Sequence, residues 1–163
     1  MTESNNRVYI GMMRDSLKTK KEILIRLLDR TKEQEELLSS EDMDVERFEE
    51  LLEEKGDGID ELNRMDEGFD SLFKKLEQEL KANRSEYEDE IKEMKKLIGD
   101  ITDLSTKIQM TEKRNNEKFQ KFLTDERKKI REGNKSQQTA MTYLQNMGGY
   151  HKPGDSYFVN ETK

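Results

Sequence analysis

The apolar residues of this chain recur at steps of three and four over most of its length. Because an α-helix turns once every 3.6 residues, this spacing places them along one face of a helix. The pattern therefore predicts long helices that meet along narrow apolar seams. The first run comprises Ile10, Met13, Leu17, Leu24, Leu27 and Leu38. The second comprises Val45, Phe48, Leu52, Ile59, Leu62, Phe69, Phe73, Leu76 and Leu80. The third comprises Ile91, Met94, Ile98, Ile101 and Ile108, and resumes with Phe119 and Phe122.

Side chains that cap helices indicate where these helices begin and end. The first helix is predicted from about residue 7 to Ser39, where a cluster of Ser, Glu and Asp residues begins, and the second then runs to about Ala82. Ser85 and Glu88 have the spacing of a capping box, which predicts the start of a third helix that extends almost to Gly133. The predicted fold is all-α, an elongated antiparallel bundle or coiled coil of three long helices.

The composition changes after residue 133, which divides the chain into a long-helix bundle over 1–133 and a C-terminal tail over 134–163. Within the tail, apolar residues again repeat at helical spacing and predict a short amphipathic helix. An isolated helix of about twelve residues is marginal in water, so it either docks on the bundle or folds on a partner, and otherwise the tail is flexible. The candidate partner-binding residues of the tail are Met141, Tyr143, Leu144, Met147, Tyr150, Tyr157 and Phe158.

Polar residues interrupt the predicted seams. In coiled coils such residues fix the register of neighbouring helices at some cost in stability, and we expect that role here. A polar stretch at 112–116 separates Phe119 and Phe122 from the main apolar run, so we expect both rings to lie beyond the bundle and to contact a partner. The glycines at 56, 58 and 68 either bend the second helix or sit on its exposed face. The interrupting residues are Lys20, Thr31, Gln34, Lys55, Asp66, Ser105, Glu112 and Asn115.

The proportion and distribution of charged residues bear on the core, on the packing of the helices and on possible partners. Charged residues make up 41% of the chain and hydrophobic residues 31%, which leaves too little apolar material for a thick globular core. Residues 7–32 hold eight basic and three acidic side chains, whereas residues 41–80 hold sixteen acidic and five basic ones. We therefore expect the first two helices to attract each other along their flanks. No basic face extends over the whole domain, which argues against nucleic acid as a partner.

The residues that carry catalysis or bind metals are scarce. The chain has no Cys, and its single histidine, His151, has no second His or Cys with which to share a metal. There is neither a Glu-x-x-His pair nor a phosphate-binding glycine loop, so we expect no enzymatic activity, no metal and no cofactor. No stretch approaches the roughly 20 apolar residues that span a bilayer, and the first residues are polar. These features predict a cytoplasmic protein without membrane insertion.

Several segments carry a family resemblance. Residues 53–55 and 59–69 resemble the central helix of the FlgN/FliT-like flagellar export chaperones, and residues 98–104 are similar to the next segment of that family. Residues 139–143 and 156–158 are similar to its C-terminal endings. The resemblance implies a small all-helical cytoplasmic chaperone. Such a protein would bind the C-terminal helices of late flagellar subunits, such as the hook-filament junction proteins, and keep them unpolymerised.

The resemblance further implies that the C-terminal segment contacts the export apparatus, with Tyr143, Tyr150 and Tyr157 as candidates for docking at the export gate. A client helix would lie in a groove between helices, with contacts at i, i+3, i+4 and i+7. Two other functions fit the same residues. One is a structural coiled-coil protein that forms a homodimer through its apolar stripes, and the other is a helical adaptor of the export ATPase.

Overall fold

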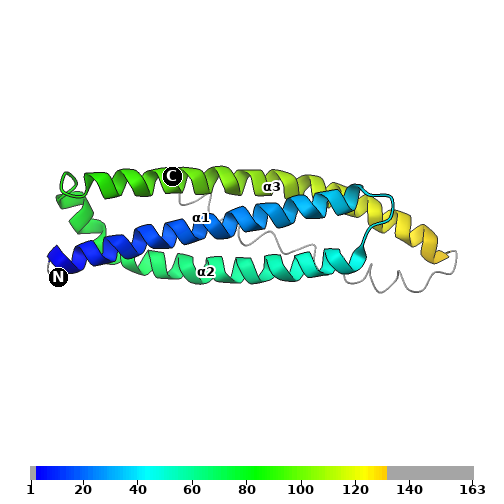
Figure 1. The fold of residues 1–163 in the computed structure, drawn as a ribbon, viewed down its shortest axis with the longest axis horizontal. Helices are drawn as coiled ribbons and strands as arrows, with labels where there is room; N and C mark the ends of the chain where they lie inside the picture. Colours follow the sequence, from blue (N-terminus) through cyan, green and yellow to red (C-terminus); the bar gives the residue numbers. More distant parts are fainter. Residues whose placement is uncertain (1–2, 132–163) are drawn as a thin grey trace.

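The computed structural model describes residues 3–131, and this part of the chain folds into three long helices. They are α1 (Glu3–Ser39), α2 (Val45–Ala82) and α3 (Glu88–Arg131), in an up-down-up arrangement in which α2 runs opposite to the other two (Figure 1). The predicted all-α bundle of three long helices is confirmed. The predicted tail helix lies outside the described residues.

The turn between α1 and α2 forms as the cap-forming residues predict. Asp44 is the N-cap of α2, where its Oδ1 accepts a hydrogen bond from the amide of Arg47 at 3.1 Å. This bond satisfies one of the amides that have no partner within the first turn of a helix. The first helix, α1, begins at Glu3, four residues before its predicted start.

The capping box predicted from Ser85 and Glu88 is wrong. Residues 83–87 form turns, and α3 begins at Glu88, with the carbonyl of Tyr87 accepting a hydrogen bond from the amide of Ile91 at 2.9 Å. The side chain of Tyr87 is fully buried. Burial of this large ring is worth more than one capping hydrogen bond, so it fixes the turn and places the helix start after Tyr87.

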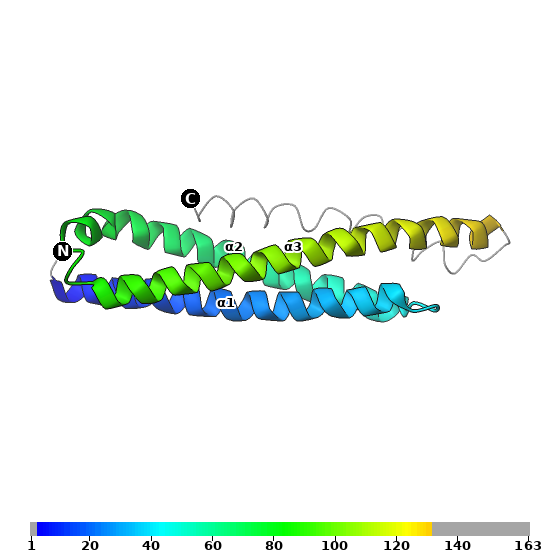
Figure 2. The same cartoon turned by 90° about the horizontal axis from the view of Figure 1, so that it is seen from above.

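Helix α1 holds the other two helices together. It packs along both α2 and α3, whereas α2 and α3 approach each other only weakly. Figure 1 and Figure 2 show the reason, because α1 lies between α2 and α3 in the first view, and α2 and α3 are inclined to each other and cross in the second. Hydrogen bonds from side chains between α1 and α3 join residues 79 to 84 positions apart, from Arg7–Glu90 to Lys118–Ser39, as expected for two parallel helices in constant register.

The core consists of two apolar clusters with a polar layer between them. The larger cluster includes residues of all three helices, among them Leu24, Leu62 and Ile101. The smaller cluster lies near the α1–α2 turn and is built around Phe48 and Phe119. Along each helix, buried or half-buried polar residues separate the two clusters. The separating residues are Thr31 and Gln34 of α1, Lys55 of α2, and Glu112 and Asn115 of α3.

Seven of the eight polar seam residues bond across helices, and the exception is Ser105, whose buried hydroxyl has no hydrogen-bond partner among the described residues. In the layer, Lys55 Nζ donates to Gln34 Oε1 at 2.8 Å and pairs with the carboxylate of Glu112, so one side chain joins all three helices. Asn115 Nδ2 donates to the backbone carbonyl of Thr31 at 3.0 Å. Such bonds form only when the helices are at one height relative to each other, which supports the register role expected from the sequence.

The glycines do not interrupt α2, which is helical from Val45 to Ala82. Gly58 is partly buried. The Cβ of a larger residue at this position would lie 3.1 Å from Leu27 Cδ2 of α1. Gly58 therefore permits close approach of α1 and α2, a role that neither sequence interpretation includes. Gly68, in contrast, is exposed and would leave an added Cβ in open space.

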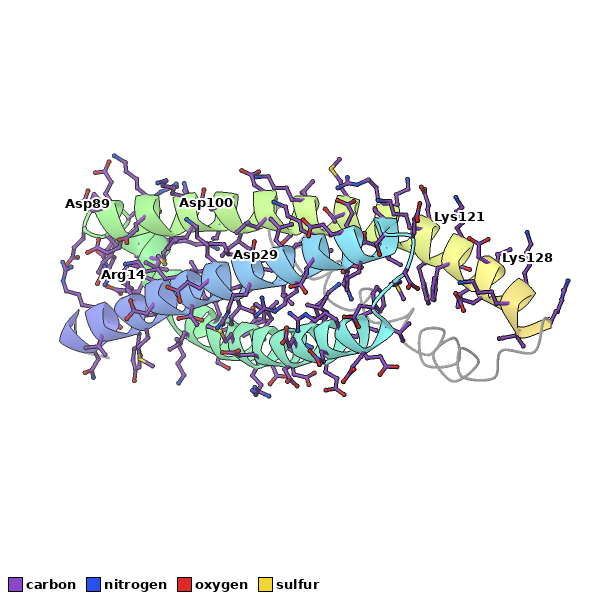
Figure 3. The ribbon with its side chains drawn as sticks, turned by 45° about the vertical axis from the view of Figure 1, so that its right-hand side comes forward. Arg14, Asp29, Asp89, Asp100, Lys121 and Lys128 are labelled. Carbon is purple, nitrogen blue, oxygen red and sulfur yellow. The ribbon has the colours of Figure 1, made fainter. Side chains whose placement is uncertain are left out.

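The expected charge attraction between the first two helices is only part of the pattern. Arg30 of α1 pairs with Glu54 of α2 at 2.5 Å. Other cations of α1 pair with α3, however, as in Lys21–Asp100 at 2.9 Å and Arg14–Glu93 at 3.6 Å. Arg14 and Asp100 are labelled in Figure 3. The cause is the parallel packing of α1 on α3, which brings the basic half of α1 beside the acidic first turns of α3.

Candidate partner-binding site

An open apolar groove lies between the C-terminal part of α2 and the N-terminal part of α3, and we call it the α2–α3 groove. It encloses about 290 Å³. Phe69, Phe73 and Leu80 line it from α2, and Ile91 and Ile98 line it from α3. Consecutive wall residues of each helix are four or seven positions apart, so they share one face. The two faces look toward each other across the groove.

The floor of the groove belongs to the main core. Met13 of α1 and Met94 of α3 lie at its base, and both are buried. The wall residues pack against the same cluster but stay half-buried, except Phe73, which is 40% exposed. Phe73 stacks on Phe69, with ring centroids 6.3 Å apart and ring planes 8° apart. The groove stays open because the crossing of α2 and α3 keeps their apolar faces from closing on each other.

The rim of the groove is predominantly basic. Three exposed cations stand on it, Lys81 from α2, Arg84 from the α2–α3 turn and Lys95 from α3, together with the single anion Glu77. Lys81 Nζ lies 3.0 Å from Glu77 Oε1. This rim contrasts with the balance of charge along α2, since residues 41–80 hold sixteen acidic and five basic side chains.

The α2–α3 turn fixes one end of the groove. Arg7 of α1 lies over the ring of Tyr87, 5.3 Å from its centroid, in the geometry of a cation–π contact. The same guanidinium lies 3.6 Å from Glu86 and 3.4 Å from Glu90. The turn is thereby tied to the start of α1.

Two adjacent residues of α1 fix the other end. Lys20 pairs with Asp66 of α2 at 2.6 Å, and Lys21 pairs with Asp100 of α3 at 2.9 Å. Asp66 lies one helical turn before Phe69 of the groove wall. Burial raises the pKa of Asp66, the hydrogen bond and charge of Lys20 lower it, and the charge of Asp70 raises it, with a net increase. The hydrogen bond from Lys21 lowers the pKa of Asp100.

A second hollow, the distal surface, lies where α3 extends past the α1–α2 turn. It encloses about 580 Å³, and apolar residues such as Leu38, Met43 and Phe122 line it together with several charged ones. Figure 3 shows Lys121 and Lys128 on the part of α3 that extends past the turn. The distal surface thus mixes apolar and charged side chains, whereas the walls of the α2–α3 groove are apolar.

The two phenylalanines that were expected beyond the bundle, Phe119 and Phe122, lie in different environments. For Phe119 that position is wrong, since its side chain is 8% exposed and its ring centroid lies 6.4 Å from that of Phe48 in a stacked arrangement. The polar stretch before it does not end the packing, because Asn115 is itself buried and bonded to α1. Phe122 is half-buried, packs against the smaller cluster and lines the distal surface.

The other predicted site residues lie outside the described residues. They are Met141, Tyr143, Leu144, Met147, Tyr150, Tyr157 and Phe158. The groove itself was missed, because Phe69, Phe73 and Leu80 were assigned to a buried seam. The available signal was the width of the stripe, since residues 69, 72, 73, 76 and 80 cover more of the helix surface than one narrow seam needs.

Residues 3–131 contain no group of three or more His, Asp or Glu side chains placed to hold a metal ion. In the same range, no helix is both long enough and apolar enough to cross a membrane.

Comparison with known proteins gives one match. A family model described as FlgN protein matches residues 11–150, which is most of the chain. No curated protein and no solved structure matches it.

Proposed function

The chain belongs to the FlgN family of flagellar export chaperones, and from this premise we propose that its clients are the C-terminal helices of hook-filament junction subunits or of other late flagellar subunits. The family is one of chaperones and not of enzymes. In the cytoplasm, the protein would cover the helix through which a subunit polymerises, prevent premature assembly and deliver the subunit to the export apparatus.

The α2–α3 groove is the observation that best supports this proposal. Phe73 is 40% exposed in a chain where 41% of residues are charged, and half-buried apolar side chains surround it. Exposed apolar surface of this kind in a soluble protein marks a place where another molecule binds. A helix can lay its apolar face into such a groove, as amphipathic helices do on other helical receptors. The methionines at its floor adapt to side chains of different shape.

The C-terminal tail and the distal surface are the proposed contacts with the export gate or the export ATPase. Aromatic residues supply much of the binding energy at protein interfaces, and the tail carries Tyr143, Tyr150, Tyr157 and Phe158. Phe122 adds an apolar side chain on the distal surface. We expect Tyr143→Ala to weaken binding of the export-gate cytoplasmic domain by about 1 to 3 kcal/mol.

Calorimetric titration tests this function. The full chain, Tyr143→Ala and a chain that ends at Asn134 are titrated with C-terminal fragments of junction subunits and with the export-gate cytoplasmic domain. We expect the full chain to bind a subunit fragment and to suppress polymerisation of that subunit. If the chain that ends at Asn134 bound both partners with the same affinity as the full chain, the tail would not be a recognition element.

The two alternative functions give different results in the same experiment. A stable rod-shaped dimer that binds no subunit fragment would favour a structural coiled-coil protein. Binding to the export ATPase alone would favour an adaptor. Absence of binding to any late-subunit fragment would contradict the proposed function.

A further inference from the structure

We infer that the α2–α3 groove, and not the distal surface, is the client site, and that it selects an acidic amphipathic helix of about four turns. This inference rests on the proposed function and specifies the chemistry of the client. The length, the walls and the rim of the groove each contribute to the argument.

The length of the groove sets the size of the occupant. Its wall on α2 extends from Phe69 to Lys81, which is about 18 Å at 1.5 Å per residue, and Arg84 stands beyond it in the α2–α3 turn. A client helix of about 15 residues, or four turns, covers that distance. The described part of the chain consists of helices and turns and offers no strand edge to which an extended peptide could add, so a helix is the expected conformation of the client.

The walls define what the client must present. The enclosed volume of about 290 Å³ accommodates side chains and not a whole helix, so the client helix lies over the groove and inserts an apolar stripe. The rings of Phe69 and Phe73, already stacked on each other, are the natural contact for that stripe. Aromatic residues in a well-packed groove typically dominate binding.

The rim defines the charge of the client. Lys81, Arg84 and Lys95 outnumber Glu77, so the rim attracts acidic residues on either side of the apolar stripe. These cations are exposed, and salt screens their interactions. They therefore contribute more to orientation and association rate than to affinity.

The same charge argues against two other occupants. The amphipathic segment of the tail, residues 139–147, contains no Asp or Glu and offers the rim no carboxylate. A second copy of this chain would bring its own basic rim to the contact in a symmetric dimer. The client helix is the occupant that fits both the walls and the rim.

Single substitutions with matched controls test the site. Phe73→Glu places a charge in the groove. Its control, Ile25→Glu, places the same charge on α1 outside the groove, at a residue of nearly equal exposure, 41% against 40%. Lys95→Glu reverses a rim charge, and Lys92→Glu reverses an exposed charge of α3 that does not line the groove. Circular dichroism and thermal unfolding verify that each variant folds.

The probes are C-terminal fragments of junction subunits and two synthetic four-turn peptides with the same leucine stripe, flanked by Glu in one and by Lys in the other. We expect the full chain to prefer the Glu peptide. Phe73→Glu should weaken binding at least about tenfold, and Lys95→Glu about threefold at low salt with little effect at high salt. The controls at Ile25 and Lys92 should bind like the wild type.

Each other outcome identifies which claim fails. If the wild type binds a subunit fragment and Phe73→Glu binds it equally well, the groove inference is overturned while the proposed function stands. If the wild type binds no late-subunit fragment, the proposed function fails. A wild-type dimer that Phe73→Glu converts to a monomer would assign the groove to self-association. An affinity for the Glu peptide that rises more than about tenfold when the chain ends at Asn134 would assign the groove to the chain's own tail.

Discussion

Replacing Lys20 by Met should destabilise the protein strongly, because it removes the cation from a buried ion pair. The Lys20 ammonium lies 2.6 Å from Asp66 Oδ1, and the two side chains are only 5% and 7% exposed. In the variant, the Asp66 carboxylate stays buried without its ammonium partner. Breaking a buried pair from one side typically costs about 3 to 5 kcal/mol, whereas exposed pairs contribute about 0 to 1 kcal/mol.

The loss should depend on pH in a defined direction. Burial already raises the pKa of Asp66, and Lys20 opposes that increase, so the variant raises this pKa further. A carboxyl group whose pKa is raised by folding destabilises the folded state above that pKa and has no effect below its ordinary value of 3.8. The difference in unfolding free energy between wild type and Lys20→Met should therefore shrink as the pH falls toward 3.8.

A double substitution separates the charge from the packing. Lys20→Met combined with Asp66→Leu removes both charges and fills the site with apolar side chains. Replacing a whole buried pair in this way is typically neutral or stabilising by about 1 to 4 kcal/mol. The double variant should therefore recover the stability that the single variant loses.

Urea unfolding followed by circular dichroism measures these differences. The matched control is Lys92→Met, which removes the cation of the exposed pair Lys92–Glu88 at 3.2 Å and should change stability by less than about 0.5 kcal/mol. A loss in Lys20→Met as small as in this control would refute the reasoning. So would a double variant that is no more stable than the single one.

Three further predictions concern packing, glycine and pH. Leu76→Ala should cost about 2 to 5 kcal/mol in urea unfolding because Leu76 is fully buried, whereas Phe73→Ala at 40% exposure should cost about 1 kcal/mol. Gly68→Ala should raise the melting temperature, since the added Cβ meets open space and Ala favours a helix over Gly by about 1 kcal/mol. Gly58→Ala should raise the melting temperature less, because its Cβ would lie 3.1 Å from the core residue Leu27. The hydrogen bond from Arg47 lowers the pKa of Glu33 below its ordinary value of 4.5. This pair therefore stabilises the fold above pH 4.5, and its contribution disappears as the pH falls through the lowered pKa. In urea unfolding at several pH values, Glu33→Gln should lose less stability on acidification than the wild type.

The helices and the seam positions of the buried polar residues could be predicted from the sequence, because both follow from local periodicity. Residues such as Leu17, Leu62 and Met94 recur at helical spacing and are buried. Polar residues placed on the same stripes, such as Lys20 and Asp66, had to lie inside the bundle, and they pair there. In these cases the position of a residue on its own helix is enough to determine its environment.

The features that were missed depend on how helices meet. Tyr87 is fully buried, but it lies in a turn, where no periodicity signals burial. Phe119 was expected beyond the bundle because a polar stretch precedes it, yet that stretch includes the buried Asn115. Likewise, nothing in the apolar stripe distinguishes Phe73 from its buried neighbour Leu76. The crossing of α2 and α3 decides which of the two faces the groove.

The arrangement around the groove explains how a thin bundle can keep an apolar surface open. Because α2 and α3 hardly touch, their separation is set by what each bonds to on α1. At one end Lys20 and Lys21 tie α1 to both walls, and at the other end Arg7 holds the α2–α3 turn through Tyr87. On the proposed function, a groove fixed at both ends would be formed before its client arrives, and binding would avoid the entropic cost of ordering the walls. Replacing buried polar pairs by an apolar seam is typically neutral or stabilising, so the arrangement of these pairs is better explained by the groove whose walls they position than by stability.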